Sequence, residues 1–246
     1  MRNIKIIIEY DGKNFPGWQN QPGKVSIQGE IEKAIKEITG EEVDLIASGR
    51  TDAGVHAFGQ TANFHTESKL PAEKFIYALN AKLPKSIVIK SAEEVEERFH
   101  SRYNCKGKTY RYIINNNEFP SALDRYREFH VPYKLNKTAM RKALEKFEGE
   151  HDFKGFKSSG GSPKKTTVRT LTKCEMIEKD DRIIIELTGD GFLYNMVRII
   201  CGTIVDVGLG KIKEEEIEEI INSGDRTRAG KTLPPHGLYL VKVFYE

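Results

Sequence analysis

The stretch IKIIIEYDG at residues 4–12 decides the fold, because its run of β-branched residues ends in an Asp-Gly turn and so predicts a strand. A helix follows, with Ser26 as its N-cap, apolar residues at helical spacing and Gly40 at its end. The first hundred residues also contain expected strands at 43–47, 59–66 and 86–92 and a helix at 71–83. The order strand, helix, strand, strand, helix, strand predicts an antiparallel sheet with two helices on one face, a ferredoxin-like unit.

The rest of the chain repeats this theme with different spacing. Its expected elements are strands at 106–114, 168–178, 182–189 and 238–245 and helices at 136–148, 192–207 and 213–222. The acidic string EEVEE at 93–97 is typical of a solvated connector between the two sets. We therefore expect an α+β fold of two ferredoxin-like halves, residues 1–97 and 98–246, whose antiparallel sheets form a central cleft.

Composition excludes several classes of protein. With 246 residues, 38% of them hydrophobic, and a mean hydropathy of −0.52, the chain is expected to fold as a soluble globular protein with a sizeable core. No run approaches the roughly 18 apolar residues of a membrane span, and the N-terminus resembles no signal peptide, so we expect a cytoplasmic protein. The formal net charge is only +3, so a polyanion partner would have to meet locally clustered Lys and Arg.

The three cysteines are odd in number and widely spaced. Cys105, Cys174 and Cys201 form no CxxC pair, which argues against a disulfide framework and against a zinc site. We interpret them as reduced, small core residues.

Basic residues gather in two stretches. Residues 98–128 hold seven basic and three acidic side chains, and residues 154–173 hold six basic side chains and no acidic one. Aromatic residues are interleaved with the first stretch, namely Phe99, Tyr103, Tyr110, Tyr112 and Tyr126. Any single charge run is more often an ordinary solvated face, but two acid-poor stretches flanking one cleft favour a polyanion. A surface that combines positive charge with aromatic side chains for base stacking suits looped or single-stranded RNA, so we expect an RNA-binding cleft.

The most unusual string is ASGRTDAGVHAFGQ at 47–60, between two expected strands. Asp52 lies in its glycine-flanked loop, two residues after Arg50. By composition alone, an aspartate that bonds its own turn, with Arg50 as a surface partner, is the commoner situation, and His56 is more often packed than catalytic. The sequence has no HxxxH, Walker A or GxGxxG motif, so metal and nucleotide chemistry are unsupported.

These residues resemble a known family. GRTDAGVHAFGQ is very similar to the active-site motif of the TruA-type tRNA pseudouridine synthases. Other segments resemble the same family in the same order and extend the resemblance over essentially the whole chain: EYDGKNFPGWQNQP at 9–22, RFHSRYNCKGKTYRYII at 98–114, GDGFLYNMVRIICGTIVDVG at 189–208, DRTRAG at 225–230 and HGLYLVKVFY at 236–245. Two places depart from the pattern: Asn20, where family members often carry a basic residue, and the loop at 158–167.

The resemblance implies an isomerase that converts uridine to pseudouridine at positions 38, 39 and 40 of the tRNA anticodon stem-loop. It implies base flipping, a homodimer and neither cofactor nor metal, with Asp52 as the catalytic nucleophile. A carboxylate suits this reaction because its reference pKa of ~3.9 leaves it ionised at neutral pH without an activating base. The sequence leaves open whether Asp52 adds to the uracil ring or acts at the sugar.

The resemblance also assigns supporting roles. Arg198 matches an arginine that pairs with the catalytic aspartate, Tyr110 a tyrosine that stacks on the target base and serves in proton transfer, and Leu238 an apolar residue below the base. Arg50 matches a position that contacts RNA near the flipped nucleotide. Each residue also has an ordinary structural alternative. Arg198 would be a surface arginine, Tyr110 and Leu238 would be core residues, the latter in a strand, and Arg50 would form a surface ion pair.

Lys108 and Arg169 lie in the basic stretches, and we expect them to contact phosphates.

Two other functions fit less well. A noncatalytic RNA-binding module would share the basic and aromatic surface, but it gives no reason for an aspartate in the cleft. A glycoside hydrolase needs a second carboxylate that the 47–60 loop does not supply.

Overall fold

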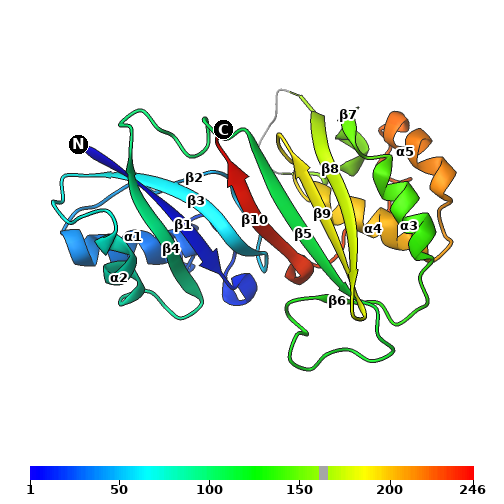
Figure 1. Ribbon diagram of the computed structural model, residues 1–246, viewed down its shortest axis with the longest axis horizontal. Coiled ribbons are helices and arrows are strands. Elements are labelled where there is room, and N and C mark those ends of the chain that lie inside the picture. The colour runs from blue at the N-terminus through cyan, green and yellow to red at the C-terminus, as the bar shows by residue number, and fades with distance from the viewer. Residues whose placement is uncertain (161–165) are drawn as a thin grey trace. The chain divides into compact units, whose positions relative to one another are not determined.

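The computed structural model describes residues 1–160 and 166–246 (Figure 1). The chain divides into two compact units, the first made of Met1–Lys106 with Tyr239–Glu246 and the second of Gly107–Leu238. The domain boundary expected at residues 97 and 98 stays a prediction, as does the cleft between the halves, and each unit is described by itself.

The first unit has the predicted sheet with helices on one face. Its strands are β1 (Arg2–Tyr10), β2 (Ile46–Ala47), β3 (His56–Thr66), β4 (Ile87–Val95) and most of β10 (Leu238–Phe244). The order is β4-β1-β3-β10 with β2 on β3, and only β10 runs parallel to its neighbour β3. The antiparallel part has the strand arrangement of a ferredoxin-like unit, which confirms the predicted fold class.

The helices of the first unit are α1 (Ile27–Thr39) and α2 (Lys74–Asn80), with a short 3-10 turn η1 (Gly12–Asn14) after β1. The Ser26 side chain accepts the Gly29 N–H and Gly40 ends α1 in the left-handed conformation, as predicted. The alternating residues Ile4, Ile6 and Ile8 of β1 are fully buried. So are the core-facing residues of the two helices, namely Ile27, Ile31 and Ile35 of α1 and Phe75 and Leu79 of α2. This packing forms the core of the unit.

The second unit is also an antiparallel sheet covered by helices. Its strands are β5 (Gly107–Asn115), β7 (Gly149–Asp152), β8 (Val168–Lys179) and β9 (Arg182–Gly189) in the order β5-β9-β8-β7, with the short β6 (Phe129–His130) parallel to β5. Its helices and turns are α3 (Lys137–Glu145), η2 (Phe153–Phe156), α4 (Met196–Gly208), η3 (Glu214–Glu216), α5 (Ile217–Ser223) and η4 (Pro235–Gly237). Helix α4 is the central core helix, since nearly every one of its positions is buried.

One helix starts later than predicted. The apolar pattern predicts a helix from residue 192, but α4 begins at Met196 because Asn195 adopts a left-handed conformation with φ 62°. Leu193 therefore packs from the preceding loop and not from the helix. Gly202 of α4 is buried, and a Cβ there would lie 1.9 Å from the Lys231 carbonyl oxygen.

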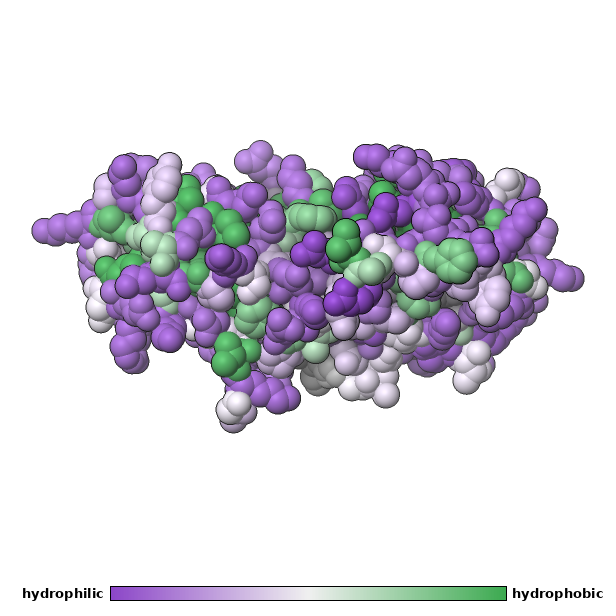
Figure 2. Space-filling model, turned by 90° about the horizontal axis from the view of Figure 1, so that it is seen from below, coloured by the Kyte–Doolittle hydropathy of each residue, from purple (hydrophilic) through white to green (hydrophobic). Residues whose placement is uncertain are grey.

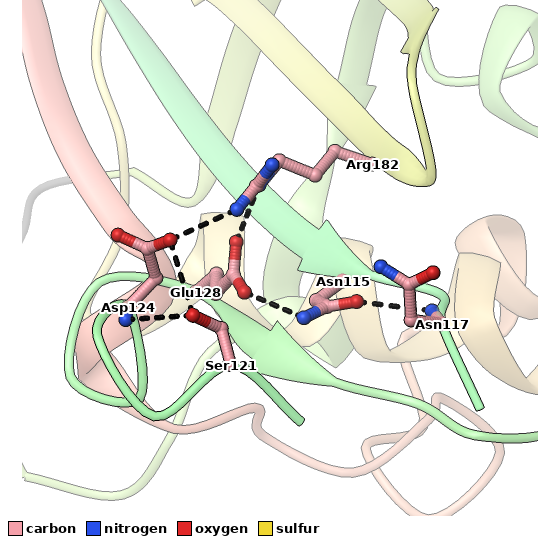
Figure 3. Close-up of polar contacts among 6 residues, drawn as sticks. All are labelled: Asn115, Asn117, Ser121, Asp124, Glu128 and Arg182. Atoms are coloured by element: carbon pink, nitrogen blue, oxygen red, sulfur yellow. Dashed lines mark hydrogen bonds and ion pairs between the residues drawn. The ribbon is translucent and has the colours of Figure 1, made fainter. Parts of the chain in front are cut away.

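A polar network holds the segment between β5 and β6 (Figure 3). Arg182 on β9 pairs with Glu128 at 2.6 Å and with Asp124 at 2.9 Å, and Asn115 donates to the second oxygen of Glu128 at 2.6 Å. Glu128 and Asn115 are buried. Arg182 therefore compensates two of the three acidic side chains in the basic stretch 98–128.

One face of the molecule is mainly polar (Figure 2). Figure 2 shows one face on which hydrophilic residues predominate and hydrophobic residues form small separate groups. Among the described residues, no helix combines the length and apolar character needed to cross a membrane. Cys174 and Cys201 are buried, as predicted, and Cys105 is half-buried.

Candidate active site

Asp52 lies in the loop that connects β2 to β3. Its backbone forms an isolated bridge with Gly17, the Trp18 N–H donates to the Thr51 carbonyl at 3.0 Å, and the Val55 N–H donates to the Asp52 carbonyl at 3.1 Å. Thr51 and Val55 are buried and Asp52 is half-buried. The loop is therefore fixed on both sides of the carboxylate, which stays partly accessible.

Two glycines let the segment after β1 approach this loop. A Cβ on Gly12 would lie 2.0 Å from the Val55 carbonyl oxygen, and one on Gly17, which has φ +115°, would lie 2.8 Å from the Thr51 carbonyl oxygen. Both positions therefore exclude any side chain. The close approach of the string EYDGKNFPGW to the Asp52 loop therefore depends on glycine at both positions.

Buried side chains brace the same loop from the sheet. The Tyr10 hydroxyl bonds the Thr51 hydroxyl at 2.7 Å, and the fully buried Gln60 donates from Nε2 to the Gly49 carbonyl at 2.8 Å while its Oε1 accepts from the Ser48 hydroxyl at 2.7 Å. The sequence analysis missed Tyr10 and Gln60. Gln60 belongs to the 47–60 string and Tyr10 ends β1, but no local pattern marks their bonds to the loop.

His56 packs below the loop. The residue is 2% exposed, and its ring stacks on Tyr239 with the ring centroids 4.9 Å apart. The Gly12 N–H donates to Nδ1 at 3.0 Å, and an Asp11 carboxylate oxygen lies 3.2 Å from the same nitrogen. In the neutral tautomer that accepts this bond at Nδ1 the ring proton is on Nε2, and the contact with Asp11 is an ion pair only when the ring is protonated. The interpretation of His56 as a packed histidine fits this geometry.

Arg198 is the third residue of α4 in the second unit. Its Nε donates to the Leu233 carbonyl at 2.6 Å, and its Nη1 donates to Asn195 Oδ1 at 2.6 Å. The side chain is half-buried. Its guanidinium is therefore held by specific acceptors and is not a surface group extended into water.

Tyr110 and Tyr112 lie on the same face of β5, as the two-residue period predicts, but their environments differ. Tyr110 is half-buried and meets Phe192 edge-on, with ring centroids 5.0 Å apart. Tyr112 is fully buried and its hydroxyl donates to the Pro234 carbonyl at 2.7 Å. Burial raises the pKa of Tyr112 well above its usual value, although the nearby Arg198 acts in the opposite direction. The expectation that Tyr112 contributes to a stacking surface is therefore wrong.

The remaining predicted residues have less distinctive surroundings. Leu238 is buried, Arg50 is exposed in the Asp52 loop, and Lys108 is half-buried on β5. Arg169 is half-buried, and its guanidinium donates to the carbonyls of Thr166, at 3.1 Å, and Val168. Their roles stay predictions.

The loop at 158–167 was also singled out. Residues 161–165, which include Lys164 and Lys165 of the second basic stretch, lie outside the described residues. In the first stretch, Arg98 pairs with Glu96 at 2.8 Å and Arg111 with Glu186 at 2.6 Å. Part of the local basic excess is thus compensated by acidic residues beyond the stretch.

The family model described as tRNA pseudouridine synthase matches residues 6–104 and 143–246. The chain belongs to this family. The matched ranges contain Arg50, Asp52, Arg169, Arg198 and Leu238, whereas Lys108 and Tyr110 lie outside them.

Curated relatives extend the match of this tRNA pseudouridine synthase family member over the full chain. It is 56% identical over 246 residues to the tRNA pseudouridine synthase A of Acetivibrio thermocellus and to that of Caldicellulosiruptor saccharolyticus, covering 100% of each chain. The protein of the same name from Ruminiclostridium cellulolyticum is 52% identical over 246 residues, again with 100% coverage of both.

A solved structure described as an archaeal box H/ACA sRNP Nop10-Cbf5 complex is also similar, at 15% identity and a TM-score of 0.38, covering 83% of this chain and 42% of that chain. At that TM-score the similarity supports no conclusion about this tRNA pseudouridine synthase family member.

Proposed function

We propose that this protein isomerises uridine to pseudouridine in tRNA, with Asp52 as the nucleophile. The observation that carries the proposal is the fixed Asp52 loop in a chain of this family. The loop backbone is held by Gly17 and Trp18 and braced by Tyr10 and Gln60, and Asp52 itself is half-buried. A preorganised carboxylate needs no further reorganisation when the substrate arrives.

The proposed reaction conserves every atom of the nucleotide. The C1′–N1 bond breaks, the detached uracil turns, and a bond forms between C1′ and C5 while the C5 proton is lost and N1 gains a proton. Asp52 is the electron-pair donor, either by addition to the uracil ring or by attack at the sugar carbon, and it leaves unchanged at the end. The rearrangement needs no redox partner, which is why we propose a reaction without a cofactor.

The other residues are assigned supporting roles in the same reaction. Arg198 orients and stabilises the Asp52 carboxylate, Tyr110 stacks on the target base and takes part in proton transfer, and Leu238 supplies apolar surface below the base. What supports Arg198 is that its guanidinium is already held by two acceptors of its own unit. A fixed guanidinium recognises a carboxylate at lower entropic cost than a mobile one.

The target base lies within a stem and has to leave the stack, which costs a few kcal/mol. We propose that Arg50, exposed and two residues from Asp52, contacts RNA next to the flipped nucleotide. Lys108 and Arg169 are proposed to contact phosphates.

We further propose that the substrate is the anticodon stem-loop, at positions 38, 39 and 40, and that the enzyme acts as a cytoplasmic homodimer. The test is to incubate wild type and Asp52→Asn with an unmodified tRNA transcript and to map pseudouridine by chemical adduct and primer extension. Product from wild type alone, confined to the anticodon arm, supports the proposal. Binding by both proteins with product from neither would instead support a noncatalytic RNA-binding module.

A further inference from the structure

Asn195 has an unusual backbone for its position. It is the N-cap of α4, and with φ 62° it is one of two non-glycine residues in the described chain with a positive φ, the other being Asp180. An asparagine at an N-cap normally has extended backbone and accepts a backbone N–H of the first turn, but Asn195 makes no such cap bond. Non-glycine residues in this conformation cluster at functional sites.

The Asn195 amide is instead used by two other side chains. Oδ1 accepts from Arg198 Nη1 at 2.6 Å, and Nδ2 donates to the Ser158 hydroxyl at 3.0 Å. The orientation of the amide is fixed by chemistry, because a guanidinium only donates and therefore requires the oxygen. A second acceptor, the Leu233 carbonyl, takes Arg198 Nε at 2.6 Å. The guanidinium is thus held at two of its nitrogens.

From this geometry we infer that Asn195 is a positioning residue whose amide sets the orientation of the Arg198 guanidinium. The inference rests on the proposed function, in which Arg198 acts on the Asp52 carboxylate. Glycine would adopt the left-handed backbone more readily, and serine or aspartate would cap the helix as well. Asparagine tolerates this backbone and also provides an acceptor for Arg198 together with a donor for Ser158.

The most informative variant is Asn195→Gly. It keeps the left-handed backbone and removes only the amide, so we expect a melting temperature at or above that of wild type. In steady-state reactions with unmodified tRNA transcript, we expect kcat to fall roughly 10- to 100-fold with little change in KM. The reason is that a misplaced group weakens stabilisation of the transition state and leaves tRNA binding unchanged.

Two further variants separate orientation from packing. Asn195→Asp keeps the oxygen that accepts from Arg198 and loses the donor to Ser158, so it should restore most of the kcat lost in Asn195→Gly. Asp180→Gly is the matched control, because it relieves the same backbone conformation in the turn between β8 and β9. It should leave kcat unchanged. Wild-type kcat in Asn195→Gly, or no recovery in Asn195→Asp, would overturn the inference.

A double variant tests whether Asn195 acts through Arg198. In the Arg198→Lys background the guanidinium is absent, so Asn195→Gly should cause no additional loss of kcat. A full additional loss would show that Asn195 acts independently and would overturn the inference. Wild-type activity of Arg198→Lys and Arg198→Ala would instead refute the proposed role of Arg198. Loss of activity in these two variants, with wild-type kcat in Asn195→Gly, would refute only the positioning role.

Discussion

Substituting Gly12 by alanine tests whether the close approach of the segment after β1 holds the Asp52 loop. The added Cβ would lie 2.0 Å from the Val55 carbonyl oxygen, whereas real Cβ atoms essentially never come closer than 3.0 Å, so the two segments must separate by at least about 1 Å. This movement would also lengthen the bond from the Gly12 N–H to His56 Nδ1. A displacement of about 1 Å at a catalytic group costs on the order of 100-fold in rate.

We therefore expect Gly12→Ala to lose roughly 100-fold in single-turnover kcat and about 1–3 kcal/mol in the free energy of unfolding. The control is Gly40→Ala at the end of α1, where φ is +78° and no atom lies within 4 Å of the added Cβ. It should cost about 1 kcal/mol of stability and leave the kcat of the folded enzyme intact. Equal kcat in Gly12→Ala and wild type, measured where both are folded, would refute the reasoning.

Three further predictions concern stability. Tyr10→Phe and Thr51→Val should show a coupling energy of about 1 kcal/mol in a double-mutant cycle of urea unfolding, because the two hydroxyl groups share one buried hydrogen bond at 2.7 Å. Additive effects of the two substitutions would contradict this prediction. Because the pKa of Tyr112 is raised in the folded state, its stabilising contribution is complete below about pH 10 and falls as the pH rises further, since only the unfolded chain then ionises. Tyr112→Phe should therefore reduce the alkaline loss in the free energy of unfolding, and an unchanged slope of that free energy against pH would count against the prediction. Arg182→Ala should destabilise by about 2–3 kcal/mol, because the buried Glu128 carboxylate loses its contact with Arg182 and keeps the bond from Asn115, while Arg182 itself is 37% exposed. A loss below about 0.5 kcal/mol, on the order of a surface pair, would show that the pair is screened.

Local patterns were enough to predict much of the fold. The apolar alternation of β1 and the caps Ser26 and Gly40 are determined by neighbouring residues, and the structure confirms them. The parallel pairing of β10 with β3, through Tyr239 and His56, depends on residues far apart in the chain and leaves no local pattern. The late start of α4 was missed for another reason: the apolar period continues through residue 193, and only the backbone of Asn195 interrupts the helix.

The sequence was enough to predict the candidate catalytic residue, but it did not predict the residues that hold the catalytic loop in place. Asp52 stands out because its motif is unusual, whereas Gln60 is one of many polar strand residues, and nothing nearby in the sequence marks its bonds to Ser48 and Gly49. Tyr112 was misjudged because its place among the interleaved basic and aromatic residues does not indicate the depth of its burial. Its partner, the Pro234 carbonyl, is distant in sequence.

The central claim is that the Asp52 carboxylate carries out the isomerisation. The most direct measurement is the single-turnover rate of pseudouridine formation by Asp52→Asn on saturating tRNA transcript, alongside its tRNA affinity and melting temperature. We predict that the rate falls by at least about 10⁴-fold, as expected for loss of a nucleophile, while affinity and melting temperature stay close to wild type. A rate within about tenfold of wild type, the scale of a modest change in packing or orientation, would contradict the claim.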